Sequence, residues 1–171
     1  MWTRRQRQMC IRDSDRSGGV ASEFDEPTPT SKRGERRLAA ERAWIDTFSD
    51  TRVSVQIMRI AGIYGPGRSV IEQVAAGRAR IIEKEGQVFN RIHVDDIGTS
   101  LIASMLRPND KRIYNLADGN PCASGDVTRY ACKLLQVEPP TPIKFEDAQL
   151  SDMARSCLLY TSPSPRDGSI S

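Results

Sequence analysis

The sequence has few of the residues that build metal sites, and it has no long apolar run. It contains one histidine and four cysteines among 171 residues, and no two cysteines are spaced as CxxC. This excludes the usual zinc-ligand spacings, so we expect no metal site, and it favours a reduced, cytoplasmic location. No apolar segment approaches the roughly 20 residues that cross a bilayer. Because no signal-peptide pattern is visible either, no membrane partner is expected.

Both ends of the chain resemble translated sequencing adapter. The stretch RRQRQMCIRD at residues 4–13 is similar to the translation of an adapter used in transposon-based library preparation, and CLLYTSPSPRD at residues 157–167 resembles its matching partner. We therefore expect residues 1–14 and 156–171 to be non-native. Residues 15–155 are then the natural part, a piece of one domain.

The charge balance changes when these ends are set aside. They hold five of the 25 basic residues and two of the 22 acidic residues, which leaves the natural part with no net charge. The basic cluster of Arg4, Arg5 and Arg7 lies in the adapter-like end. No nucleic-acid partner is therefore expected.

The clearest structural pattern is the stretch VSVQIMRIAGIYGPGRS at residues 53–69. Apolar residues fill most of positions 53–60, which is typical of a strand buried in a parallel sheet. Gly62, Gly65 and Gly67 then open a loop, and apolar residues at helical spacing follow it. The unit predicts an α/β fold, in which ligands bind at the carboxyl ends of the strands.

Further elements are predicted on both sides of this unit. We expect helices over 30–48, from Val94 to about 106 and over 124–136, a short last helix over 145–153, and a strand over 112–116. The pieces 81–82 and 88–92 predict short strands or a hairpin. The apolar residues expected to face inward are Leu38, Ala39, Trp44, Ile45 and Phe48 on the first helix, Ile97, Leu101, Ile102, Met105 and Leu106 on the second, and Val127, Ala131, Leu134 and Leu135 on the third.

Three sets of residues are candidates for chemistry, and each has a structural alternative. The glycine loop at 62–68 can hold an anionic or cofactor group, or it is an ordinary strand-to-helix turn. His93 can exchange protons near neutral pH, but a lone histidine between apolar neighbours favours a structural hydrogen bond. Arg33 and Arg37, four residues apart on one helix, can clamp a phosphate or carboxylate, or they form a solvated face.

Four stretches together resemble an extended or atypical short-chain dehydrogenase/reductase, the NAD-dependent epimerase/dehydratase group. They are PTSKRGERRLAAE from residue 29, RIAGIYGPGR from 59, RIHVDDI from 91 and IYNLADGNP from 113. Their order is similar to the C-terminal two thirds of that family. The resemblance implies a fragment of a Rossmann-like, doubly wound parallel sheet together with the substrate-binding part.

The resemblance also implies a cofactor, a substrate and the residues that contact them. The cofactor is NAD or NADP, and the small-molecule substrate is a carbonyl or sugar-like compound. The residues that the resemblance implies to bind the cofactor are Arg37, Ile60, Ala61, Gly62 and Ile63. The backbone of the last four is implied to lie beside the nicotinamide. The residues implied to face the substrate are Gly62, Arg68 and Arg91.

The chain departs from the family pattern at two places. Arg33 and Arg37 stand where family members carry Tyr-x-x-x-Lys, and an arginine cannot act as a general acid at neutral pH. The glycine-rich pyrophosphate fingerprint is absent from the sequence. We therefore expect the parent protein to be an NAD(P)-dependent oxidoreductase or epimerase-like enzyme, and this fragment to be inactive. The alternative is an NAD(P)-sensing regulatory protein without catalysis. The sequence gives no indication of the oligomeric state.

Overall fold

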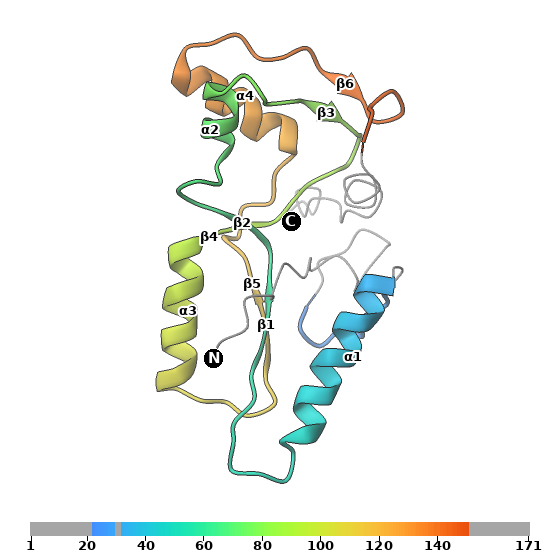
Figure 1. Ribbon diagram of the computed structural model, residues 1–171, viewed down its shortest axis with the longest axis vertical. Helices are drawn as coiled ribbons and strands as arrows, with labels where there is room; N and C mark the ends of the chain where they lie inside the picture. Colours follow the sequence, from blue (N-terminus) through green and yellow to red (C-terminus); the bar gives the residue numbers. More distant parts are fainter. Residues whose placement is uncertain (1–21, 30–31, 151–171) are drawn as a thin grey trace, which may run out of the picture.

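The computed structural model describes residues 22–29 and 32–150, and the adapter-like ends lie outside these residues. Helices are interspersed with single strands or consecutive pairs of strands along the described chain (Figure 1). The elements in chain order are α1 (Lys32–Thr47), β1 (Ile57–Ile60), β2 (Gly62–Tyr64), α2 (Val70–Ala75), β3 (Ile82–Glu83), β4 (Arg91–His93), α3 (Val94–Leu106), β5 (Ile113–Leu116), α4 (Ser124–Leu135) and β6 (Ile143–Lys144).

One half of the structure is a three-layer arrangement. β1 and β5 pair in parallel, with Ile57 opposite Ile113 and Ile60 opposite Leu116. Figure 1 shows this pair between α3 on one side and α1 on the other. Parallel strands with helices on both faces are the arrangement that the strand, loop and helix pattern predicts.

The other half carries two further parallel pairs. β2 pairs with β4, and β3 pairs with β6. α2 lies against α4 at the end of the structure that Figure 1 places at the top. The most deeply buried side chains, Ile81 and Cys132, lie in this half. Gly125 at the start of α4 lets this helix approach Ile81 closely, because a Cβ there would lie 3.1 Å from Ile81 Cγ2.

A buried ion pair holds α1 to the sheet. Arg59 of β1 and Glu41 of α1 are 4% and 8% exposed. The Arg59 Nη2 donates to Glu41 Oε2 at 2.9 Å, and the Arg59 Nε lies 3.3 Å from the same oxygen and 3.4 Å from Oε1. A guanidinium that meets both oxygens of one carboxylate fixes the orientation of both side chains. The pair therefore sets how α1 lies on β1.

The strand predicted from residue 53 begins later than the sequence pattern indicates. Val53 is 52% exposed, and its amide donates to Thr51 Oγ1 within a turn. The Val55 amide donates to the Asp110 carboxylate instead of to a strand. The prediction of a buried strand from residue 53 was therefore wrong for its first four residues, since side chains of Thr51 and Asp110 accept the amides of Val53 and Val55.

Of the two alternatives predicted for residues 81–82 and 88–92, the structure has short strands and no hairpin, because β3 and β4 each pair in parallel with a different partner. Two other predictions of local structure were wrong. The described part of the predicted last helix forms turns after β6. Several apolar residues expected to face inward are exposed instead, among them Trp44, Leu101, Ile102, Met105, Leu106 and Leu134. The described residues contain nothing that covers those side chains.

We expect the loss of one partner of the buried ion pair to destabilise the fold strongly. Glu41→Ala leaves the Arg59 charge buried without a partner, which costs about 3–5 kcal/mol. Urea unfolding followed by circular dichroism measures this loss. The double variant Glu41→Leu with Arg59→Met recovers most of it, because neither charge remains. Arg42→Ala is the control, since the Arg42–Glu26 contact is exposed and should contribute little.

Candidate functional site

The site predicted from the sequence centres on the point where the chain passes from β1 to β2. Ile60 pairs with Leu116 of β5, whereas Gly62 pairs with Arg91 of β4. Ala61 between them is buried and donates its amide to the Leu116 carbonyl at 3.0 Å. The chain thus changes its hydrogen-bonding partner at Ala61, at the carboxyl end of β1. Ligands of open α/β sheets bind outside this end of the strands.

Gly62 lies where no larger side chain fits without movement. Its amide donates to the Asn90 carbonyl at 3.1 Å. A Cβ on Gly62 would lie 3.2 Å from that same carbonyl oxygen and 3.9 Å from Arg91 Cγ. The glycine therefore lets β2 and β4 approach closely and leaves bare backbone at the crossing.

Arg91 joins β4 to the chain that follows β5. Its carbonyl accepts the Asp118 amide at 2.7 Å, and its Nη1 donates to the carbonyls of Cys122 and Phe89 at 3.3 and 3.2 Å. Nη1 also lies 3.1 Å from the Cys122 sulfur. The Nη1 of Arg91 is therefore used by backbone carbonyls of Phe89 and Cys122. Arg91 itself pairs with Gly62 at the crossing.

The glycine turn after β2 is closed by a glutamate of its own helix. The Glu72 carboxylate accepts the amides of Gly67 and Ser69 at 2.8 and 3.1 Å. The Ser69 hydroxyl in return accepts the Glu72 amide, which completes a capping box. This geometry is that of a strand-to-helix turn. Arg68 lies in the turn and is exposed.

His93 begins α3 and takes the structural role that its sequence neighbours favour. Its Nδ1 accepts the Asp95 amide at 3.3 Å, and its ring meets the ring of Tyr64 edge to face at 5.2 Å. His93 thus caps the first turn of α3. His93 also lies close to Gly65, where a Cβ would be 3.5 Å from its Nε2.

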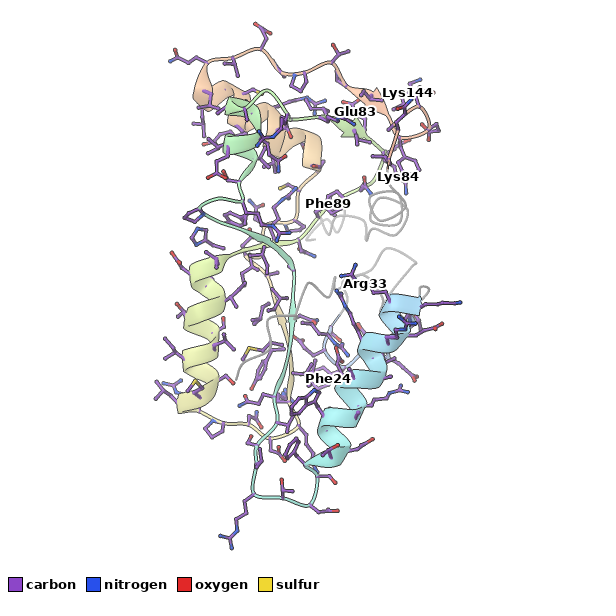
Figure 2. The ribbon with its side chains drawn as sticks, in the orientation of Figure 1. Phe24, Arg33, Glu83, Lys84, Phe89 and Lys144 are labelled. Carbon is purple, nitrogen blue, oxygen red and sulfur yellow. The ribbon has the colours of Figure 1, made fainter. Side chains whose placement is uncertain are left out.

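Two arginines of α1, Arg33 and Arg37, share a face of the helix with Glu41, because the three residues follow at intervals of four. Glu41 contacts Arg59 of β1, so this face is turned to the sheet. α1 runs antiparallel to β1 in Figure 1, which places its first turns near the carboxyl end of that strand. Arg37 is half-buried, whereas Arg33 is exposed and projects from the end of the helix in Figure 2.

The structure therefore brings some predicted site residues together. Gly62 and Arg91 are direct partners across two strands, and Ile60, Ala61 and Ile63 continue the same backbone. Arg37 lies one turn before Glu41 on α1, and Glu41 forms the ion pair with Arg59 of β1. Sequence reasoning missed that pair, although the arginine within an otherwise apolar strand pattern was the signal that could have revealed it.

A separate cavity lies between β3 and the start of α4. Its volume is about 340 Å³, and none of the predicted site residues lines it. Gln87 is buried in its wall, and Arg129 pairs there with Glu83 and with Asp126. Figure 2 shows Glu83 and Lys84 at this end of the molecule. The sequence pattern gave no indication of this cavity.

Two further properties concern the described residues only. Across 22–29 and 32–150, histidine, cysteine, aspartate and glutamate side chains form no group of three or more that could hold a metal ion. None of the helices in these ranges has the length and apolarity needed to cross a membrane.

Comparison with solved structures identifies the fold. A conserved protein of unknown function from Silicibacter pomeroyi is 38% identical and superposes with a TM-score of 0.82, over 90% of this chain and 54% of that protein. MoeE5, solved with UDP-glucuronic acid and NAD, is 23% identical with a TM-score of 0.69, over 91% of this chain and 58% of MoeE5. The chain has the Rossmann-like fold of the epimerase/dehydratase enzymes. The α/β fold class predicted from the sequence is confirmed, and so is the resemblance to that family.

A curated relative agrees with this result. A dTDP-L-rhamnose 4-epimerase from Burkholderia thailandensis is 27% identical over 146 residues, which are 75% of this chain and 39% of the epimerase. No family model matches the chain. The chain spans about half the length of the solved relatives and about two fifths of the curated relative.

The packing of the glycine turn against α3 leads to a paired prediction. A Cβ at Gly65 would lie 2.7 Å from Val94 Cγ1, so Gly65→Ala forces the start of α3 to move. We expect it to lower the free energy of unfolding by about 1–3 kcal/mol. Gly98→Ala within α3 meets no atom within 4 Å and should raise it by about 0.5–1 kcal/mol. Denaturant titration of both variants measures the difference, and equal values would contradict the packing described here.

Proposed function

We propose that the whole protein, of which this chain forms a part, is an NAD(P)-dependent oxidoreductase or epimerase-like enzyme that acts on a small carbonyl or sugar-like compound. The observation that carries the proposal is the crossing at Ala61 and Gly62. There, bare backbone lies at the carboxyl end of β1, beside the α1 face that carries Arg37. MoeE5, which shares the fold, was solved with a sugar nucleotide and NAD.

The residues present fit the nicotinamide and ribose end of such a cofactor. In this proposal a flat ring lies along the backbone of Ile60, Ala61 and Ile63, where Gly62 adds no side chain and lets β2 approach β4 closely. Arg37 supplies a permanent positive charge for a ribose hydroxyl or a phosphate. When bound, the cofactor would accept or supply a hydride.

The substrate lies on the other side of the crossing in this proposal. Arg91 stands directly opposite Gly62, and Arg68 follows β2 in the exposed turn. Two arginines suit a ligand with anionic groups, such as the diphosphate of a sugar nucleotide. Arg91 orients the chain around Cys122 through its Nη1, so it serves both the fold and the ligand.

One observation favours a second candidate function, an NAD(P)-sensing regulatory protein. Arg33 stands at the position of the family tyrosine, and a guanidinium does not release a proton at neutral pH. His93 caps α3 through its Nδ1 and serves the fold in this proposal. A protein with this arrangement binds the cofactor without ordinary carbonyl reduction.

The 171-residue chain by itself is proposed to be inactive. It lacks the glycine-rich segment that holds the pyrophosphate of a dinucleotide at a helix N-terminus. The first experiment is therefore to recover the gene from an adapter-free library and to purify the longer product. That product is titrated with NAD and NADP, and then assayed with aldehydes and sugar nucleotides.

The role of Arg37 gives a quantitative prediction for the longer product. Arg37→Ala should weaken NAD(P) binding by about tenfold, which corresponds to 1.4 kcal/mol. Arg36→Ala is the matched control, because Arg36 is exposed one position away on α1 and should bind the cofactor as before. Isothermal titration calorimetry measures both. Equal affinities for the two variants would remove Arg37 from the cofactor site.

Turnover assays of the longer product distinguish the enzyme hypothesis from the sensor hypothesis. Oxidation of the reduced cofactor, or epimerisation of a sugar nucleotide, supports the enzyme. Tight cofactor binding with no turnover of either substrate class supports the sensor. Absence of NAD and NADP binding contradicts both.

A further inference from the structure

His93 lies at the junction of β4 and α3, where one of its ring nitrogens has two neighbours of opposite character. β4 ends at His93 and α3 begins at Val94, so the two elements follow without a loop (Figure 1). The His93 Nδ1 lies 3.3 Å from the Asp95 amide nitrogen, which is a donor. The same Nδ1 lies 3.5 Å from Asp95 Oδ2, which is an acceptor.

Only one of these two contacts forms in a given protonation state of the ring. An unprotonated Nδ1 accepts the Asp95 amide and caps α3, and the ring then carries its single proton on Nε2. A protonated ring has an N–H at both nitrogens, so Nδ1 no longer accepts that amide. It donates instead to the Asp95 carboxylate, in a charge-assisted hydrogen bond. Because histidine changes its charge near neutral pH, the two arrangements belong to opposite sides of that range.

The charges around His93 come from every segment packed against it. The titratable and charged side chains of these segments are Asp95 and Asp96 of α3, Tyr64 of β2, Arg68 of the glycine turn, Arg91 of β4 and Asp118 after β5. The Nη1 of Arg91 bonds to backbone carbonyls, and the Asp118 carboxylate accepts the Asn120 amide. The positive end of the α3 dipole disfavours a cation at His93, whereas the carboxylates of Asp95 and Asp96 favour it.

Close packing joins His93 to the glycine turn after β2. The His93 and Tyr64 rings meet edge to face, with their centroids 5.2 Å apart. A Cβ on Gly65 would lie 2.7 Å from Val94 Cγ1 and 3.5 Å from His93 Nε2, so the turn and the start of α3 are in direct contact. Gly65 also exchanges backbone hydrogen bonds with Arg68. A rearrangement at His93 therefore reaches the turn.

We infer that His93 is a pH-dependent switch, which holds the glycine turn in one arrangement as the neutral cap of α3 and in another as the protonated partner of the Asp95 carboxylate. At a pH above that at which the ring takes up its proton, His93 accepts the Asp95 amide, as in this structure. Below that pH, the amide loses its acceptor and the ring donates to the carboxylate. The switch rests on the fold and is independent of the proposed cofactor and substrate.

NMR of the 15N-labelled, 171-residue chain tests the neutral state, because His93 is the only histidine in the sequence and gives one set of ring signals. Long-range proton–nitrogen spectra well above neutral pH should show the ring proton on Nε2 and an unprotonated Nδ1. A ring that carries its proton on Nδ1 under these conditions does not cap α3. That result overturns the inference.

A titration of the same chain to acidic pH tests the coupling. We expect the protection of the Asp95 amide against hydrogen exchange to fall by about fivefold as the ring protonates, after correction for the intrinsic rate, since one hydrogen bond is lost. The nuclear Overhauser effect between the Gly65 Hα and the Val94 methyl groups should change at the same pH, because it reports their separation and not the local charge. A constant effect through the ring titration would show that the turn does not move, and the inference would fail.

Three variants separate the two contacts of His93. His93→Asn supplies an oxygen that caps a helix and does not titrate, so the change at Gly65 should disappear. Asp95→Asn keeps the capped amide but removes the ion pair, so the ring should bind its proton about twofold to fivefold more weakly. Asp96→Asn is the matched control, because it removes the same charge from the same turn and leaves the ion pair in place. Equal effects of the two aspartate variants, or a change at Gly65 that persists in His93→Asn, overturn the inference.

Discussion

The buried pair of Glu41 and Arg59 is the interaction on which the arrangement of this structure depends. This ion pair joins α1 to the sheet, and both of its side chains are buried. Two buried charges are costly unless their geometry is good, and here one guanidinium meets both carboxylate oxygens. The pair stabilises less by its attraction than by excluding other orientations, since any rotation of α1 would leave two charges buried and unpaired. The position of Arg37 follows from this constraint.

The same constraint explains why the candidate site lies where it does. Arg59 is fixed by Glu41, and two residues later Ala61 leaves β5 and Gly62 joins β4. The strand therefore cannot slide relative to α1 without breaking the ion pair. A backbone that must present a flat cofactor face needs this rigidity, because catalytic and binding groups act only within narrow geometric limits. The glycine turn beyond β2 is fixed separately by Glu72, so the site has two independent supports.

Local patterns predicted the order of the elements well, because strand and helix periods are properties of short stretches. The helix before Phe48, the strand that ends at Leu116 and the helix from Ser124 lie close to the predicted ranges. The later start of β1 was not predicted, because part of it depends on a distant partner: Asp110, 55 residues away, accepts the Val55 amide. The site residues came from the family resemblance, and Glu41 was missed because nothing local distinguishes it from a surface glutamate.

The apolar residues of α3 that were predicted to face inward are exposed in the structure, and the difference has a physical meaning. Periodicity in a sequence reports which residues are buried in the complete molecule, whereas exposure reports only what the described chain contains. Leu101, Ile102, Met105 and Leu106 have the spacing of a core face, yet they are exposed, and nothing among residues 22–29 and 32–150 covers them. Four exposed apolar residues on about one and a half turns of one helix favour association. The spacing therefore predicts more burial for α3 than the described residues provide.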